Sequence, residues 1–196
     1  IAFPTDTVYG IAVDVFNDLA VQKIFDIKGR DANKPLQILI AKKDDLKSIV
    51  RDFTEVLNIL VSEFWPGPLT IVVPARPDFP ERVRCGLDTI GIRMPSNLIA
   101  LKIIEDFGAP VAATSANISG MPDPKDAEDV IESLGDKIDL IIDGGKTTDN
   151  IPSTVIDLSV DPPVILRHGK LDESEIRRIL NLNRGKNMKI AIGGDH

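Results

Sequence analysis

The sequence predicts a single α/β (α+β) domain in which helices flank a mixed β-sheet. The chain has 196 residues, a length that fits one domain, and its 43% hydrophobic residues are enough to fill a core. Apolar runs of strand length alternate along the chain with segments of helical periodicity. No sequence repeat, low-complexity tract or internal linker interrupts this pattern before a polar tail. We therefore expect one domain over residues 1–182.

The first half of the chain is expected to contain the end of one strand, three further strands and three helices. The segment Ile1-Ala2-Phe3 has the character of the end of a strand. Apolar runs predict strands within 10–16, 35–41 and 69–74. Helical periodicity predicts helices over 18–28, 44–50 and 54–65. Asn17 or Asp18 can cap the first of these helices, and Pro66-Gly67-Pro68 stops the third.

The second half repeats the alternation of strands and helices. Strands are predicted within 89–95, 110–117, 138–145, 153–160 and 163–169. Helices are predicted over 97–108, 126–134 and 172–182. Gly108 ends the first of these helices, and Asp172 is a suitable N-cap for the last. We expect the last two strands to pair in antiparallel fashion across Asp161-Pro162-Pro163.

Charge and cysteine content limit the classes of partner and compartment. The formal net charge of −7 disfavours non-specific binding to nucleic acids or anionic membranes, so a site for a polyanion must be local. A single cysteine, Cys85, cannot form an internal disulfide, which suits a reducing cytoplasm. No apolar run approaches the roughly 20 residues that span a bilayer. We expect a cytoplasmic protein without a membrane partner.

Both ends of the numbered chain lead to hypotheses. Because the chain lacks an initiator Met and opens within a strand-like run, we expect that some native N-terminal residues precede Ile1. Residues 183–196 are expected to be a linker followed by the stub of a second domain. The stub hypothesis rests on "MKIAIGGDH" (188–196), which resembles the opening of B-type ribose-5-phosphate isomerases. An ordinary disordered tail is the alternative.

Three polar loops next to apolar strands are candidates for a ligand site: "PTDTVYG" (4–10), "KGRDANK" (28–34) and "TSANISG" (114–120). Lys28 and Arg30 alternate, so in an extended segment both would project to one face and could grip phosphate oxygens. Thr114, Ser115 and Asn117 add hydroxyl and amide donors. Each loop alone could merely shape a turn or cap the backbone. Their combination favours an anion site.

Several common catalytic patterns are missing from the sequence. His168 and His196 are the only histidines, so a Ser-His-Asp or Cys-His arrangement has little to build on. Neither common glycine-rich phosphate-binding motif occurs. The acidic residues form no evident metal cage, so the sequence predicts no protein metal site.

Seven motifs, in order along the chain, carry a resemblance to a known family. They are "FPTDTVYGIAVD", "KGRDANKPLQILI", "FWPGPLTIVV", "TIGIRMP", "PVAATSANISG", "PSTVIDL" and "ILRHG". On these motifs residues 1–182 resemble the YrdC-domain family of threonylcarbamoyl-AMP synthases. The resemblance implies a strongly twisted, concave mixed sheet around a positively charged cavity. It also implies an enzyme, a nucleotidyltransferase, that joins L-threonine, bicarbonate and ATP into threonylcarbamoyl-AMP and releases pyrophosphate.

The resemblance also implies roles for individual residues. Lys28, Arg30, Ser115 and Asn117 match the family's catalytic set, which contacts the nucleotide phosphates and the reacting carbamate. The matching phosphate-binding positions further include Lys34, Ser153 and Arg167. The positions that match the threonine pocket are Thr7, Tyr9, Arg93 and Ser153. This chain departs from the family pattern at Asp31 and His168, where the family often has proline.

The implied reaction sets expectations for cofactors and partners. Mg²⁺ would enter with the ATP phosphates, with no permanently bound cofactor. The adenylate would pass to a threonylcarbamoyl transferase that modifies adenosine 37 of tRNA, and a weak contact with tRNA is also expected. An RNA-binding module of the same fold is the main alternative, although the net charge of −7 gives it little support. A paralogue that transfers a carbamoyl group from carbamoyl phosphate is a third reading.

Overall fold

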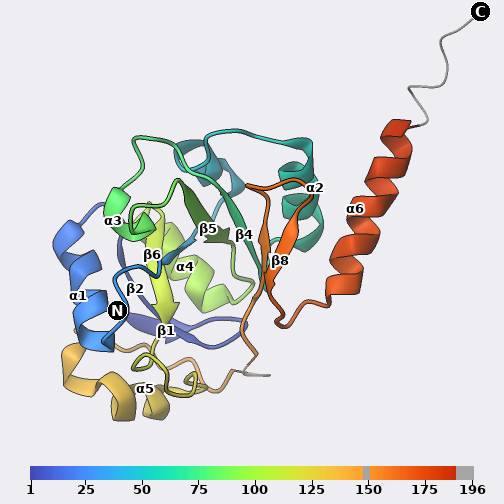
Figure 1. Cartoon of the computed structure of the whole chain (residues 1–196). Coiled ribbons are helices and arrows are strands. Elements are labelled where there is room, and N and C mark those ends of the chain that lie inside the picture. Colours follow the sequence, from blue (N-terminus) through green and yellow to red (C-terminus); the bar gives the residue numbers. More distant parts are fainter. Residues whose placement is uncertain (148–150, 189–196) are drawn as a thin grey trace, which may run out of the picture.

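A mixed sheet is the centre of the fold (Figure 1). The computed structural model describes residues 1–147 and 151–188. Within them the sheet has eight strands in the order β1-β2-β6-β3-β5-β4-β7-β8. The strands are β1 (Ala2–Pro4), β2 (Tyr9–Asp14), β3 (Gln37–Leu39), β4 (Leu69–Pro74), β5 (Thr89–Arg93), β6 (Val111–Ser115), β7 (Thr154–Asp157) and β8 (Val164–Arg167). β3 and β5 are parallel, as are β4 and β7, and the other neighbours are antiparallel, which confirms the predicted mixed sheet.

The helices begin and end at residues that suit helix termini. They are α1 (Asp18–Lys28), α2 (Glu55–Phe64), α3 (Glu81–Arg84), α4 (Leu98–Phe107), α5 (Ala127–Leu134) and α6 (Glu173–Met188), with 3₁₀ turns η1 (Lys43–Ser48) and η2 (Gly135–Lys137). The Asn17 side chain accepts a hydrogen bond from the Ala20 N–H and so caps α1. Gly108 ends α4 at a φ of 77°, a conformation that costs glycine little.

One face of the sheet is buried in the main core. Alternate strand residues such as Ile38, Ile71 and Ile92 point to this face, as the two-residue period of a strand requires. α1 and α2 cover it with Ile24 and Leu60, which belong to the same cluster of buried side chains. The residues between them in the strands therefore point to the opposite face.

The opposite face is only partly covered. α4 packs Ala100 and Ile104 against Leu39 and Ala113, near the side of the sheet that contains β1, β2 and β6. α5 contributes Val130 to a separate cluster at β1 and β2. This arrangement leaves the face of β3, β5, β4 and β7 open to a cavity.

Some predicted elements differ in the structure. The strand predicted within 138–145 is reduced to a single bridge between Ala2 and Ile141, because β1 is only three residues long and Ala2 alone bonds to this segment. The helix predicted over 44–50 is the shorter 3₁₀ turn η1. Helix α3 was not predicted.

The C-terminal helix is longer than predicted. α6 continues to Met188, so residues 183–188 are helical where a linker was expected. The rest of the hypothetical stub, residues 189–196, lies outside the described residues. Within 1–147 and 151–188, no helix is long and apolar enough to cross a membrane.

Candidate functional site

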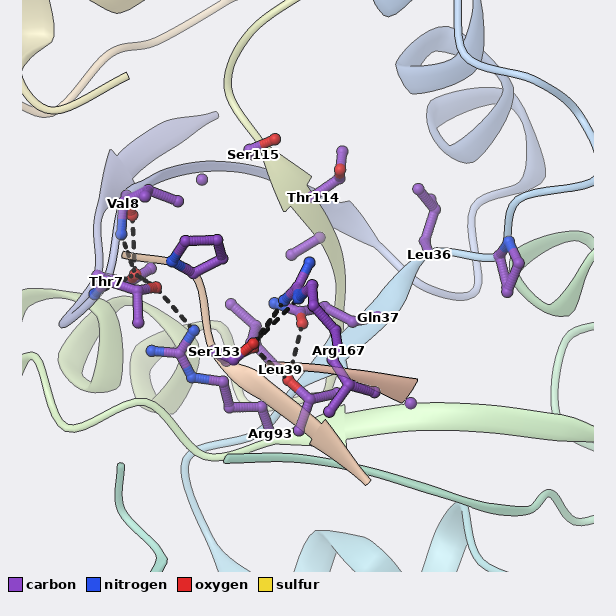
Figure 2. A pocket seen from close by; sticks show the side chains of 18 of the residues that line it. Thr7, Val8, Leu36, Gln37, Leu39, Arg93, Thr114, Ser115, Ser153 and Arg167 are labelled. Atoms are coloured by element: carbon purple, nitrogen blue, oxygen red, sulfur yellow. Dashed lines mark hydrogen bonds between the residues drawn. The ribbon is translucent and has the colours of Figure 1, made fainter. Parts of the chain in front are cut away.

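A cavity of about 380 Å³ lies on the open face of the sheet (Figure 2). Its floor follows the two-residue period of the strands, because residues of one face alternate with residues of the core. The floor residues are Gly10 of β2, Ala113 and Ser115 of β6, Gln37 and Leu39 of β3, Gly91 and Arg93 of β5, Thr70 and Val72 of β4, and Val155 of β7 with the adjoining Ser153.

Three guanidinium groups reach this cavity from different parts of the chain. Arg30 follows α1, Arg93 ends β5 and Arg167 ends β8. The Arg30 side chain donates hydrogen bonds to the backbone oxygens of Lys34 and Pro35, at 3.0 and 2.9 Å. These bonds hold the turn before β3 in place. Three cations around one cavity in an acidic chain give a local site for an anionic ligand.

Arg93 is held by a buried network at the first polar loop. It donates to Thr7 Oγ1 at 2.9 Å, to the Gly67 carbonyl at 3.1 Å and to Asp6 Oδ1 at 2.5 Å. Asp6 Oδ1 also accepts from the Ser96 N–H at 3.0 Å. Burial lowers the pKa of Arg93, and the Asp6 carboxylate opposes that shift. The network fixes the side chains of Thr7 and Arg93 at one wall of the cavity.

Ser153 and Arg167 form another part of the cavity wall. Arg167 Nε and Nη2 donate to the Ser153 carbonyl at 3.0 and 2.9 Å, and Nη2 also donates to Ser153 Oγ at 3.1 Å. Figure 2 shows both side chains directed into the cavity beside Gln37. Ser153 immediately precedes β7 and Arg167 is the last residue of β8, so the antiparallel pair β7–β8 brings them together.

Lys28 differs from the prediction. It is the last residue of α1, and the left-handed conformation of Gly29 turns the chain, so Lys28 and Arg30 do not lie on one face of an extended segment. The ammonium group is buried and donates to the carbonyl oxygens of Ser115 and Asn117 and to Asn117 Oδ1. Burial, with the nearby Arg30 charge, lowers its pKa to about 8. Lys28 thus anchors the 114–120 loop.

The predicted site residues separate into two groups. Thr7, Arg30, Arg93, Ser115, Ser153 and Arg167 line the cavity together. Outside its lining, Asn117 accepts from Ser115 Oγ at 2.6 Å and donates to the Met121 carbonyl. The buried Tyr9 hydroxyl donates to the Gly145 carbonyl at 2.7 Å, and Lys34 is exposed.

The sequence analysis missed Gln37, Thr70 and Asp123, which are polar residues of the lining that lie outside the three predicted loops. Gln37 and Thr70 interrupt otherwise apolar strand runs, "PLQILI" and "LTIVV", and this interruption was a signal available in the sequence. Asp123 is the carboxylate of the lining, and Mg²⁺ is commonly held by one or two carboxylates together with substrate phosphates. Among the described residues, no group of three or more His, Cys, Asp or Glu side chains gathers as metal ligands.

Comparison with known proteins identifies the family and the fold of this chain. The family model Sua5_yciO_yrdC, described as "Telomere recombination", matches residues 1–169. A relative from Pyrococcus abyssi named threonylcarbamoyl-AMP synthase is 47% identical over 92% of this chain and 53% of its own length. A Bacillus subtilis relative of the same name is 41% identical over 92% of this chain and 52% of its own. The chain thus spans about half the length of these two relatives.

A solved structure shares the architecture. The structure of P. abyssi Sua5 complexed with L-threonine is 47% identical, matches 91% of this chain and 53% of that chain, and gives a TM-score of 0.89. Fold and cavity define an α/β protein with a cationic, hydroxyl-lined site on one face of a mixed sheet. The chain belongs to the Sua5/YciO/YrdC family, which confirms the resemblance predicted from its motifs.

Proposed function

We propose that this chain forms threonylcarbamoyl-AMP and pyrophosphate from L-threonine, bicarbonate and ATP. The observation that carries the proposal is the convergence of Arg30, Arg93 and Arg167 with the hydroxyls of Thr7 and Ser153 around one cavity. The relatives named threonylcarbamoyl-AMP synthase support it, as does the family member described in complex with L-threonine. The same names favour the synthase over an RNA-binding module.

The proposed chemistry suits a site without a strong general base. The threonine amine and bicarbonate condense to a carbamate with loss of water. A carbamate oxygen then attacks the α-phosphorus of ATP, and the bond to the β-phosphate oxygen breaks to release pyrophosphate. Because the carbamate is already anionic, the protein mainly has to hold anions close together and neutralise the leaving group. That work suits fixed cations and hydroxyl donors.

We propose a division of these roles among the residues at the cavity. Arg30 and Arg167 would contact phosphates, while Lys28, Ser115 and Asn117 hold the 114–120 loop beside them through their hydrogen bonds. Thr7, Arg93 and Ser153 are placed to contact the amino acid. In this proposal Lys34 and Tyr9, which lie outside the lining, act only at longer range. Mg²⁺ on the nucleotide would neutralise phosphate charge, with Asp123, the carboxylate of the lining, as a candidate ligand.

The proposal extends to the partners of the reaction. Threonylcarbamoyl-AMP would be consumed by a transferase that modifies adenosine 37 of tRNA. The mixed anhydride between a carbamate and a phosphate is reactive, so prompt transfer to that enzyme is expected.

Pyrophosphate release tests the proposal. The chain would be incubated with ATP, Mg²⁺ and bicarbonate, and with L-threonine, L-serine or no amino acid. We expect release that depends on L-threonine, is strongly reduced in Arg167→Ala and is retained in Arg76→Ala, a surface arginine paired with Asp78. Absence of release from folded protein would reject the proposal. Salt-dependent tRNA binding by such an inactive protein would then support the RNA-binding alternative.

A further inference from the structure

Two polar residues on the cavity floor have no role in the proposed reaction so far. Thr70 in β4 is only 3% exposed, and Gln37 in β3 is half-buried. Both belong to strands that are otherwise apolar. A buried hydroxyl or amide is costly unless it is hydrogen-bonded, so the partners of these two groups indicate what they do.

The two residues extend a chain of hydrogen bonds from Arg167 across the floor. Arg167 Nη2 donates to Ser153 Oγ at 3.1 Å, and Ser153 Oγ lies 2.7 Å from Thr70 Oγ1. Thr70 Oγ1 donates to Gln37 Oε1 at 3.2 Å. In Figure 2 the side chains of Gln37, Ser153 and Arg167 lie close together.

The donor at one end, Arg167, and the acceptor at the other, Gln37 Oε1, fix the direction of these hydrogen bonds. A hydroxyl group has one hydrogen to donate and two lone pairs that accept. Thr70 gives its hydrogen to Gln37, so the bond between the two hydroxyls must be donated by Ser153. Ser153 Oγ accepts one bond from Arg167, and among the described contacts its second lone pair is unused. Toward a ligand, Ser153 can then only accept.

Gly91 leaves room for the hydrogen bond between Thr70 and Gln37. β5 lies between β3 and β4 in the sheet, so Gln37 and Thr70 must meet across it. A Cβ atom at Gly91 would lie 3.2 Å from Thr70 Cγ2 and 3.7 Å from Val72 Cγ2. Because glycine has no side chain, the space above β5 stays free for the bond between the neighbouring strands.

We propose that Gln37 and Thr70 are positioning residues that set Ser153 Oγ as a hydrogen-bond acceptor toward the cavity. This inference rests on the proposed function. Within it, Ser153 Oγ accepts a hydrogen bond from an N–H or O–H group of the amino-acid substrate. An anionic oxygen placed there would face a lone pair instead of a hydrogen. The hydrogen-bonded hydroxyls of Ser153 and Thr70 thereby help the cavity to distinguish the amino acid from the phosphates of ATP.

Kinetic constants of matched variants test the inference. In Thr70→Val we expect KM for L-threonine to rise about tenfold, the typical net worth of one hydrogen bond, while KM for ATP changes less than about twofold. Thr70→Ser keeps the hydroxyl and should restore the KM. Thr154→Val is the control, because Thr154 is a buried threonine on neighbouring β7 whose hydroxyl bonds to the Leu171 carbonyl, away from the cavity lining. It should lower thermal stability without changing KM.

A double-mutant cycle separates positioning from direct contact. If Thr70 acts through Ser153, Thr70→Val should have little further effect on KM in the Ser153→Ala background. Adding Gln37→Leu to Thr70→Val should likewise raise KM for L-threonine little further. Multiplicative losses in the cycle, or an equal rise in KM for Thr154→Val, would overturn the inference.

A ligand-free measurement keeps this inference separate from the proposed function. If the wild-type chain neither binds L-threonine in calorimetry nor releases pyrophosphate, the proposed function fails. The hydrogen-bond chain is then judged from the side-chain NMR signals of the Arg167 guanidinium and the Gln37 amide. Both should shift in Thr70→Val and stay in place in Thr154→Val. Unchanged signals in Thr70→Val would overturn the inference whether or not the chain binds L-threonine.

Discussion

The Lys28 ammonium is enclosed by three oxygen atoms of Ser115 and Asn117. These bonds favour the charged form of the amine, whereas burial and the nearby Arg30 charge disfavour it. Lys28 therefore links the end of α1 to the 114–120 loop through an ammonium group whose pKa burial lowers to about 8. Its protonation state determines whether the loop is anchored by a cation or by a neutral amine.

Burial lowers the pKa of Lys28 from the usual lysine value of 10.5, so we expect its amine to titrate at about pH 8 in the folded chain. Between these two values the unfolded chain binds more protons at this group, so its contribution to the free energy of unfolding should increase as pH rises through the window. NMR titration of the Lys28 side-chain Cε signal measures the midpoint. Phosphate anions of bound ATP should move it upward, and a midpoint near 10.5 in the free protein would contradict the expectation.

Arg30 offers a second prediction at the scale of one residue. Arg30→Ala removes a cation from the cavity lining, and we expect turnover to fall about 10²- to 10³-fold, as for other groups that stabilise developing charge. Initial-rate measurement of pyrophosphate release is the readout. Lys23→Ala is the matched control, because Lys23 is an exposed cation of α1 paired with Asp139. Equal loss in both variants would indicate a general charge effect in place of a contact at the site.

At the scale of elements, β7, β8 and the loop that follows them place Ser153 beside Arg167. Gly169 packs directly on this corner, since a Cβ atom there would lie 2.4 Å from the Pro152 carbonyl oxygen and from the Ser153 carbonyl carbon. The Lys170 N–H also donates to the Pro152 carbonyl at 2.9 Å. The wall of the cavity thus depends on a close approach between two backbone segments.

We expect Gly169→Ala to push Ser153 away from Arg167 and to reduce both turnover and affinity for L-threonine by at least tenfold. The opposing atoms belong to the backbone and cannot swing aside as a flexible side chain would. Steady-state kinetics and thermal unfolding measure the two effects. His168→Ala, at an exposed neighbouring side chain, should change turnover less than about twofold. Wild-type kinetics in Gly169→Ala would refute the close contact.

At the scale of the whole molecule, α6 belongs to the folded domain although the family match ends at residue 169. Ile176 is fully buried in the main core, and α6 lies beside α2 (Figure 1). We propose that the domain includes this helix through at least residue 182. The helical residues 183–188 extend it without a break.

Ile176→Ala should lower the free energy of unfolding by about 2–5 kcal/mol, because it leaves a cavity in a packed core. Chemical denaturation followed by circular dichroism gives this value. Leu98→Ala provides the matched control on α4, where the side chain is 80% exposed, and should change stability by less than about 0.5 kcal/mol. A loss below about 1 kcal/mol for Ile176→Ala would indicate that α6 is only loosely attached.

The sequence by itself determined the family and the order of most elements, although not α3 or the loss of the strand predicted within 138–145. The period of its apolar residues located β4 over 69–74 and α1 over 18–28, because burial of one face requires that spacing. Gly108 and Asn17 marked helix ends through backbone chemistry that is local. The motifs also identified six side chains that line one cavity.

Only the tertiary structure decided which of these groups line the cavity and which bond to the surrounding scaffold. Lys28 was predicted as a phosphate contact, but the turn at Gly29 directs its ammonium to oxygens of a loop almost ninety residues away. The bonds from Ser153 through Thr70 to Gln37 depend on strand order, which brings β3 and β4 to either side of Gly91. Long-range pairing of this kind leaves no periodic trace in the sequence, since each strand follows its own two-residue period whichever strand lies next to it.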